Sequence, residues 1–427
     1  MDFLTAPDCA LIIWITLVLN QLRKDHDLKD LRLWVNAMIP IIVEGVARFV
    51  YLFHLPLFWH NLLHILALLG YQIGGMLFLY AASGRMRQQP QYKHYLLLCS
   101  VAAAAIHIFY GAGVHQQLVF LICTSTGLLL GLAATFWQRL PRHYYVLQCV
   151  GWLPCIIFGG FQLYRYSEYY CLAFTYALVS VVFYITLPKK RLGRPIIYCA
   201  FMIWAFCFMS HPWLKDCYPS LVSMVGRIWD LQRFLVALGL LVFSLEEMTL
   251  AQKHNALHDQ LTGLPNRRLF DLSIEEAIAR AQSSGTRFLL LNMDLNHFKT
   301  INDTWGHEAG DCLLREVSAC LQSLTRETDA LCRMSGDEFN LIVQDFGRQI
   351  PQSQQTLRER CERMAAQIQE RVEGSTFLYA HEHQVVKLQP SICIGYAVFP
   401  DDAMDSKNLC RIADNSMYRS KRTTRTK

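Results

Sequence analysis

The strongest constraint in the sequence is a series of apolar runs that fills its first 245 residues. Each run is about 20 residues long, which is the length that a helix needs to cross the hydrocarbon core of a bilayer. Two weaker runs lie at 3–22, which carries Asp8, and at 228–245, which carries Asp230 and Arg233. We therefore predict a polytopic α-helical membrane domain of eight or nine helices over residues 1–245. The seven better-defined runs lie near 33–53, 61–83, 95–113, 118–137, 145–163, 170–187 and 195–210.

The charge content changes after Leu250. Residues 1–250 hold 18 Lys and Arg with 11 Asp and Glu, whereas residues 251–427 hold 22 and 23. The second part thus has the charge content of a globular domain. It lacks the basic balance of a nucleic-acid-binding domain, so no nucleic-acid partner is expected. The 15 cysteines contain no C-x-x-C pair and are interpreted as small buried hydrophobic residues.

The loops between the apolar runs predict an orientation, because Lys and Arg are retained on the cytoplasmic side of a membrane. Loops rich in these residues alternate with loops that are nearly free of them. With either eight or nine spans, the segment after Glu246 is then cytoplasmic. The basic loops are Arg23 to Arg32, Arg85 to Lys93, Arg139 to Arg142 and Lys189 to Arg194.

Polar residues inside the runs are candidate functional residues, because they are costly in lipid. Glu44 and Arg48 are one helical turn apart, and a structural ion pair between them is favoured over a ligand site. Several histidines gather near the outer ends of the runs. His60 and His64 have the spacing of a metal or haem site, although membrane-interface residues are the favoured interpretation. The other histidines of this group are His54, His115 and His211.

The second part begins with a polar, helix-prone segment at residues 246–258, which is a coupling helix or a linker. A turn and a helix to about Ser283 follow, and residues 287–294 form the apolar run of a buried strand that ends at Asp294. A helix is expected near 309–324. Two further apolar stretches, 330–334 and 339–343, flank Ser335-Gly-Asp-Glu338, which has the pattern of a hairpin turn. Two acids at that turn beside a strand-end aspartate would form an oxygen site for Mg²⁺.

Five segments together resemble the GGDEF family of diguanylate cyclases, which condense two GTP into cyclic di-GMP. The resemblance covers residues from about 255 to 427 and implies a palm-like α/β domain, here placed at 259–427, around an antiparallel sheet. It implies nothing about the membrane half beyond the common pairing of this domain with membrane sensors. The segments are DQLTGLPNRR, DLNHFKTINDTWGHEAGD, RETDALCRMSGDEF, SICIGYAVFP and ADNSMYRSKRTTR.

The resemblance implies a metal site that holds Mg²⁺, with two ions expected in each active site. Asp294 matches the first metal-binding carboxylate, and the carbonyl of Leu295 matches a further ligand. Asp337 matches the second carboxylate and helps to deprotonate the attacking 3′-hydroxyl. Glu338 stands beside it as an additional metal ligand and catalytic residue.

The remaining correspondences concern the nucleotide and the product. Asn302 and Asp311 match the residues that read guanine, and Arg326 with Asp329 fits the R-x-x-D inhibitory site for the product. For each residue alone, capping, packing or solvated charge is the competing interpretation. The residues that match phosphate contacts are His297, Phe298 and Lys299 through their amides, and Lys421 and Arg425 through their side chains.

Three departures from the family pattern bear on activity. Ser335 replaces the first glycine of the turn, where a Cβ atom would crowd the phosphate or demand an unfavourable φ. Asn296 replaces an aspartate that often follows the metal ligand by two residues, and Thr424 stands where glycine is usual.

The resulting hypothesis is a membrane-anchored diguanylate cyclase of the bacterial inner membrane, regulated by its membrane domain. GTP is its expected substrate, cyclic di-GMP its product and feedback ligand, and a homodimer its active form. The alternative is a catalytically degenerate domain that acts as a receptor for GTP or cyclic di-GMP. A transporter with a regulatory tail is disfavoured, because the runs contain few charges and no internal repeat.

Overall fold

The protein folds as two compact units, residues 1–249 and 250–427. The structure is a computed structural model that describes residues 5–26, 29–51, 53, 55–84, 89–346, 354–381 and 384–425. The boundary between the units falls within helix α9, so this helix contributes residues to both.

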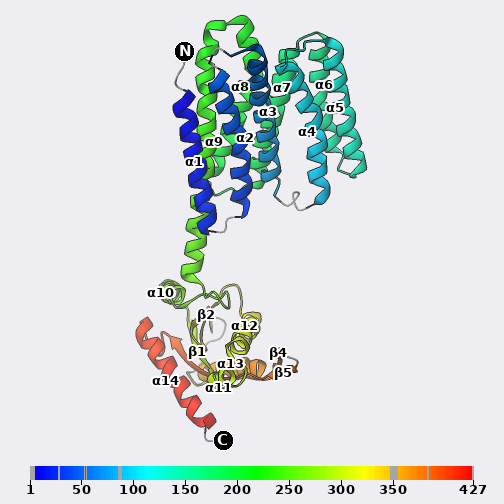
Figure 1. Cartoon of the computed structure of the whole chain (residues 1–427). Coiled ribbons are helices and arrows are strands. Elements are labelled where there is room, and N and C mark those ends of the chain that lie inside the picture. Colours follow the sequence, from blue (N-terminus) through cyan, green and yellow to red (C-terminus); the bar gives the residue numbers. More distant parts are fainter. Residues whose placement is uncertain are drawn as a thin grey trace. The chain divides into compact units, whose positions relative to one another are not determined.

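The first unit contains helices α1 to α9 (Figure 1). Both weakly predicted segments, 3–22 and 228–245, lie largely within helices, α1 and α9. The bounds are α1 Thr5–His26, α2 Lys29–Tyr51, α3 Leu57–Ala82, α4 Pro90–Gly111, α5 Gln117–Trp137, α6 His143–Gly160, α7 Tyr164–Thr186, α8 Gly193–Cys217 and α9 Pro219–Leu257.

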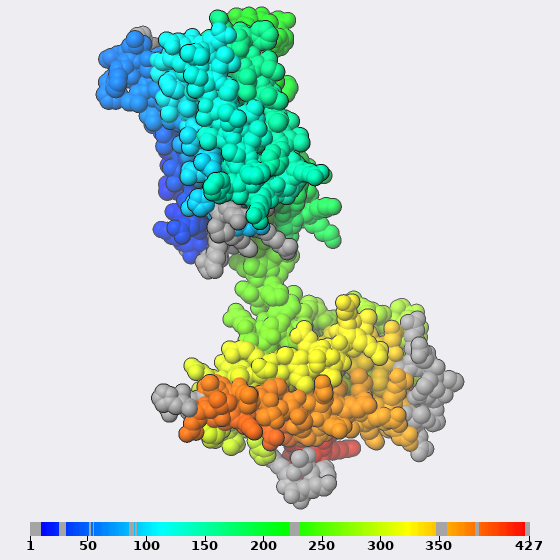
Figure 2. Space-filling view, turned by 90° about the vertical axis from the view of Figure 1, so that its right-hand side faces the viewer, coloured from blue at the N-terminus to red at the C-terminus, as the bar shows by residue number. Residues whose placement is uncertain are grey.

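Seven of these helices are long and apolar enough to cross a membrane, within the part of the chain that the structure describes. They are α2 to α5 and α7 to α9. The weakly predicted run at 228–245 lies in α9 and is therefore a candidate membrane span, whereas the better-defined run at 145–163 lies in α6, which is not one. Helix α6 is only 18 residues long and begins with His143, Tyr144 and Tyr145, which lowers its hydropathy. Helices α4 to α6 form much of the face of the first unit in Figure 2. Leu97, Leu118, Leu129 and other large apolar side chains of these helices are exposed, as lipid contact requires.

The core of the first unit is aromatic. Tyr176, Phe201, Trp204 and Phe208, from α7 and α8, are almost fully buried and pack against one another. The predicted contact between Glu44 and Arg48 is present at 3.6 Å, but Glu44 also accepts a shorter hydrogen bond of 3.0 Å from Arg233.

The contact with Arg233 was missed because Arg233 follows Glu44 by 189 residues and lies in one of the two weakly predicted runs.

Among the five histidines, His64 and His115 contact Tyr110, and His211 stacks on Tyr169. His54 lies outside the described residues.

The second unit has an antiparallel four-stranded sheet in the order β2-β3-β1-β6. This is the palm-like α/β fold that the resemblance implied. Its strands are β1 Phe288–Asn296, β2 Ala330–Ser335, β3 Glu338–Val343 and β6 Ser391–Phe399, and a separate hairpin joins β4 Phe377–His381 to β5 Gln384–Leu388. Its helices are α10 Arg267–Ser284, α11 Phe298–Trp305, α12 His307–Ser323, α13 Gln354–Glu373 and α14 Ser406–Arg425.

Strand β1 is buried on both faces, as its continuous apolar run predicted. Leu289, Leu291 and Met293 belong to a core that includes α12 and α13. Phe288 and Leu290 belong to the opposite core, which includes α10 and α14. The sheet is therefore covered on both faces, and polar groups that lie at the ends of its central strands are held by a rigid frame.

Candidate active site

The site forms where central strands β1 and β3 end. Asp294 on β1 pairs in register with Glu338 on β3, and the amide of Leu295 donates a 3.2 Å hydrogen bond to the carbonyl of Asp337. Gly336 has a φ of 51°, a left-handed conformation that glycine adopts without steric cost. The hairpin turn, which its sequence pattern predicted, thus brings Asp337 and Glu338 beside the strand-end Asp294.

A lysine from the last helix completes this cluster. The ammonium of Lys421 lies 2.5 Å from a carboxylate oxygen of Asp294, which is largely buried. Partial burial raises the pKa of Asp337 above its ordinary value, and nearby Asp294 and Glu338 raise it further, while Lys421 lowers it. The cluster is an acidic site whose mutual repulsion is only partly offset by one cation.

Helix α14 is brought to the site by close packing against β6. A Cβ atom at Gly395 would overlap the backbone of Ala413 and Met417, so only glycine permits this approach. Asn292 of β1 donates a hydrogen bond to Asp414 of the same helix. Lys421 follows Met417 by one helical turn, and so reaches Asp294. Sequence reasoning missed both anchors, although Gly395 lies within a segment that resembles the family.

The loop after β1 presents backbone amides. His297 has a φ of 56° and turns the chain from β1 into α11, where it forms the N-cap without a side-chain hydrogen bond. The first N–H groups of a helix have no partner within the helix. The amides of Phe298 and Lys299 are therefore suited to bind an anion.

Asn302 and Asp311 lie on the two helices that follow. The Oδ1 atom of Asn302 is buried and accepts no hydrogen bond from the described residues. It approaches Gly310 so closely that a Cβ atom there would overlap it, which places Asn302 beside the start of α12, where Asp311 lies. An unsatisfied buried acceptor is expensive unless a ligand donates to it.

Other predicted residues have structural partners. Asp329 accepts hydrogen bonds from the amides of Arg326 and Gln344, so its carboxylate stabilises the turn before β2, while Arg326 itself is exposed. Asn296 donates to Ser391 and Cys393 of β6. Helix α14 ends at Arg425, whose side chain, like that of Thr424, lies outside the described residues.

Ser335 does not adopt the unfavourable φ that its replacement of glycine suggested. It ends β2 and is absent from the described residues with positive φ, while the adjacent Gly336 takes that conformation. Its hydroxyl donates a 3.0 Å hydrogen bond to Glu338. The substitution thus adds a partner for one of the acids.

Arg333 connects the turn to the start of the domain. Its guanidinium donates to the carbonyl of Gly336 at 2.7 and 3.0 Å and to Asp259 at 2.7 Å. Asp259 lies two residues beyond the end of α9, and it also accepts hydrogen bonds from Thr262. Partial burial alone would raise its pKa, but the hydrogen bonds from Thr262 and Arg333 lower it below the ordinary value.

Comparison with known proteins identifies the family of the second unit. Residues 256–427 match the family model described as diguanylate cyclase, GGDEF domain. Residues 256–427 form a GGDEF domain. The acids at the end of β1 and in the turn after β2 therefore lie within a GGDEF domain, in a chain whose first unit is helical.

Curated relatives match this domain at moderate identity. The bifunctional diguanylate cyclase/cyclic di-GMP phosphodiesterase MucR of Pseudomonas aeruginosa is 37% identical over 166 residues, 39% of this chain and 22% of the relative. The response regulator PleD of Caulobacter vibrioides is 34% identical over 170 residues, 40% of this chain and 35% of the relative.

One alignment extends further. The probable diguanylate cyclase DgcT of Escherichia coli is 32% identical over 272 residues, which are 59% of this chain and 54% of the relative. That share of the chain is larger than the GGDEF domain, so the similarity continues into the helical unit. The chain spans between 22% and 54% of the length of these three relatives.

Proposed function

We propose that this protein is a membrane-anchored diguanylate cyclase, which condenses two GTP into cyclic di-GMP and two pyrophosphate under the control of its helical unit. The observation that carries the proposal is the meeting of Asp294, Asp337 and Glu338 with Lys421 at one end of a GGDEF sheet. Activity also agrees with the names of the relatives MucR and DgcT.

Mg²⁺ fits the donor set of this site. Asp294, Asp337 and Glu338, with the carbonyl of Leu295, offer the oxygen ligands that it prefers. Within the described residues no three acidic, His or Cys side chains are already arranged around a metal position. A complete cage is not required, because Mg²⁺ is usually held by one or two carboxylates together with substrate phosphates. When bound, two such ions would offset the charge of the triphosphate as the bond forms.

The protein's own groups would orient the nucleotide. The amides of His297, Phe298 and Lys299 would receive phosphate oxygens, and Lys421 with Arg425 would hold the triphosphate tail. Asn302 and Asp311 would pair with the guanine edge, which supplies the donor that the buried Oδ1 of Asn302 lacks. This pairing selects GTP over ATP.

Asp337 is the proposed acceptor of the 3′-hydroxyl proton, with Glu338 beside it. Its raised pKa makes it a better base than an ordinary aspartate, because a base works best when its pKa approaches the working pH. Each domain presents one GTP, so the two reacting groups meet only in a homodimer. Arg326, exposed at the end of its turn, would bind the phosphate or guanine of the feedback product in the family's inhibitory site, with Asp329 holding that turn.

A receptor for GTP or cyclic di-GMP without turnover is the second candidate, and the departure at Ser335 favours it. The contact of its hydroxyl with Glu338 engages a carboxylate that the cyclase needs. In a receptor, this contact has no catalytic cost.

Incubation of the purified full chain with GTP and Mg²⁺ tests the proposal, with cyclic di-GMP as the measured product. Asp294→Asn and Asp337→Asn should each lose at least about a hundredfold in turnover, which corresponds to about 3 kcal/mol of transition-state stabilisation. Asp345→Asn, outside the cluster, is the matched control and should retain turnover. Nucleotide binding without product in the wild type would favour the receptor, and near-native rates in both variants would contradict the metal assignment.

A further inference from the structure

A cavity of about 350 Å³ lies inside the helical unit. Helices α3, α4, α6 and α7 line it. It lies toward the end of the bundle with the basic loops, since His143 of its lining follows Arg142 and Ile185 precedes Lys189 by four residues. The proposed cyclase reaction makes no use of this cavity.

The size of the cavity is that of a ligand site. Protein interiors are packed as densely as organic crystals, and voids larger than a water molecule are few. An apolar cavity of about 150 Å³ is enough to bind benzene, and pockets for small molecules begin near about 300 Å³. The space therefore accommodates a substituted ring with a short tail.

The lining is rich in aromatic rings and poor in charged residue types. None of its described residues is Asp, Glu, Lys or Arg, so a charged ligand would lose its hydration without an opposite charge to replace it. Aromatic walls favour a flat ring, because rings pack in offset or edge-to-face geometry. The five aromatic residues are Tyr92, Tyr95, Tyr144, Trp152 and Phe174.

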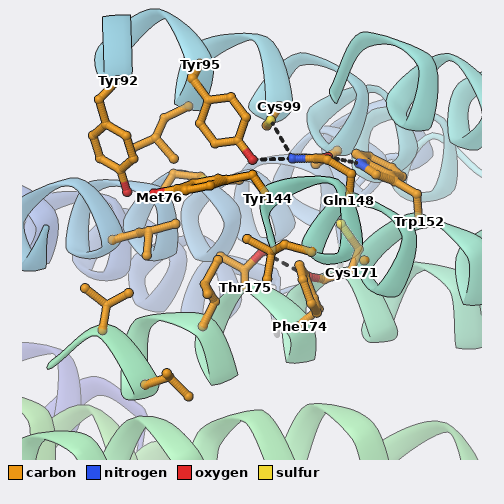
Figure 3. A pocket seen from close by; sticks show the side chains of 18 of the residues that line it. Met76, Tyr92, Tyr95, Cys99, Tyr144, Gln148, Trp152, Cys171, Phe174 and Thr175 are labelled. Carbon is orange, nitrogen blue, oxygen red and sulfur yellow. Dashed lines mark hydrogen bonds between the residues drawn. The ribbon is translucent and has the colours of Figure 1, made fainter. Parts of the chain in front are cut away.

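A hydrogen-bonding group stands in one wall. Figure 3 shows Gln148 joined by dashed lines to Tyr95, Cys99 and Trp152. The Gln148 amide donates to the hydroxyl of Tyr95 and to the sulfur of Cys99 at 3.4 Å, and its oxygen accepts from Trp152 at 3.2 Å. A thiol is a weak acceptor. A ligand oxygen would be a better partner for that amide hydrogen.

The polar wall is held in place from behind. Gly127 and Gly131 of α5 leave room for Trp152 and Gln148, because a Cβ atom at either position would overlap these side chains. On the other side Gln72 lies 3.5 Å from Thr175, and its oxygen is 3.3 Å from the ring of His107. The opposite ring nitrogen of His107 lies 3.4 Å from the buried Glu168. The orientation of the lining groups is thus built into the bundle.

The cavity is accessible from the apolar surface of the unit. Val181 and Ile185 of α7 line it and are 45% and 72% exposed. Both belong to a helix that is long and apolar enough to cross a membrane. A ligand that enters beside this face of α7 arrives from the lipid phase and must be soluble there.

We propose that this cavity binds a neutral, lipid-soluble ring that carries carbonyl or hydroxyl oxygens, the chemistry of a membrane quinone. One ring oxygen accepts a hydrogen bond from Gln148, and the ring packs between the aromatic walls. An acyl chain also fits the apolar lining, but it makes no use of Gln148 or of the flat walls.

Binding of ubiquinone-1 to the full chain in detergent micelles tests this proposal. Retention of the quinone is measured at equilibrium and compared with empty micelles at the same detergent concentration. We expect saturable binding of one molecule per chain. Gln148→Leu should weaken it by about tenfold, the loss of about one hydrogen bond. Gln116→Leu, on an exposed glutamine whose side chain makes no capping hydrogen bond, is the matched control and should bind as the wild type does.

A second variant keeps the test decisive if Gln148→Leu does not fold. Val182→Phe fills the cavity from α7 and should reduce retention to that of empty micelles, with folding checked by thermal melting. Non-saturable uptake, or equal binding by Val182→Phe, would overturn the proposal. So would displacement of ubiquinone-1 by dodecanoic acid or dodecane at equal or lower concentration, which would identify an acyl-chain site. The measurement does not depend on turnover, so its result is separate from that of the cyclase assay.

Discussion

At the residue scale, Lys421 is the group that balances the acids of the candidate active site. It lies 2.5 Å from Asp294 and lowers the pKa of Asp337, which burial and the neighbouring acids raise. Its position therefore affects both the charge of the cluster and the proton affinity of the proposed base.

Removal of this cation should move the pH dependence of turnover. In Lys421→Met the pKa of Asp337 rises further, so a larger fraction of Asp337 is protonated at any pH on the acid side. Because the protonated acid accepts no proton, the acid limb of kcat/KM should shift to higher pH. Ionisation of GTP itself is the same for wild type and variant.

The position of the limb, and not its height, is the relevant measurement, because Lys421 is also expected to hold the triphosphate. Lys407→Met, an exposed lysine near the start of the same helix, should leave the limb where it is. If the acid limb of kcat/KM had the same position in Lys421→Met as in the wild type, Asp337 would not be the group that accepts the proton.

At the element scale, the site depends on how closely α14 packs against β6. Gly395→Ala would place a Cβ atom against the backbone of Ala413 and Met417, so the helix must shift. Overpacking of this kind usually costs about 1–3 kcal/mol. We expect turnover to fall at least about tenfold, because Lys421 then leaves Asp294, and we expect the melting temperature to fall as well.

Gly285→Ala is the matched control for that substitution. Gly285 caps α10 with a φ of 64°, and a Cβ atom added there would meet no atom within 4 Å. Alanine there costs roughly 1–2 kcal/mol of stability through its backbone alone, because its Cβ atom is crowded in the left-handed conformation. Turnover below the melting transition should be unchanged. Equal loss of turnover in both variants would mean that stability, and not the position of α14, limits activity.

The two anchors of α14 also show where sequence reasoning stops. The buried strand at 287–294 and the turn acids were predicted because both signals are local: a continuous apolar run and a glycine between turn residues. The contact of Gly395 with α14 joins separate segments, and nothing in the local pattern of a strand glycine specifies its partner. The bond from Asn292 to Asp414 spans 122 residues and was missed for the same reason.

The helical unit gives a similar result. Length and hydropathy located the helices, but neither predicts a cavity, because the same apolar residues line a filled core and an open one. No sequence pattern distinguishes Gln148, since a single glutamine in an apolar helix is common. The contact of Arg233 with Glu44 likewise required two runs far apart in the chain.

At the scale of the whole molecule, the orientation of the helical unit determines whether the GGDEF domain meets GTP. Basic loops follow α1, α3, α5 and α7, which places them at one end of an up-and-down bundle. The end of α9 contacts the last basic loop. Arg191 of this loop lies 2.7 Å from Glu247 of α9. Glu246 of α9 accepts hydrogen bonds from the amides of Leu192 and Gly193. The exit of α9 and the basic loops therefore share one side.

Because basic loops are retained in the cytoplasm, fusions to the carboxyl end should report that compartment. Alkaline phosphatase fused after residue 427 should be inactive, and a fluorescent protein at the same position should be bright. The matched control is a fusion at Tyr218, between α8 and α9, where the two reporters should behave in the opposite way. An active phosphatase at the carboxyl end would place the acids of β1 and the turn outside the cell, where GTP is absent. It would contradict both the topology and the proposed cyclase, whereas quinone binding within the helical unit would be unaffected.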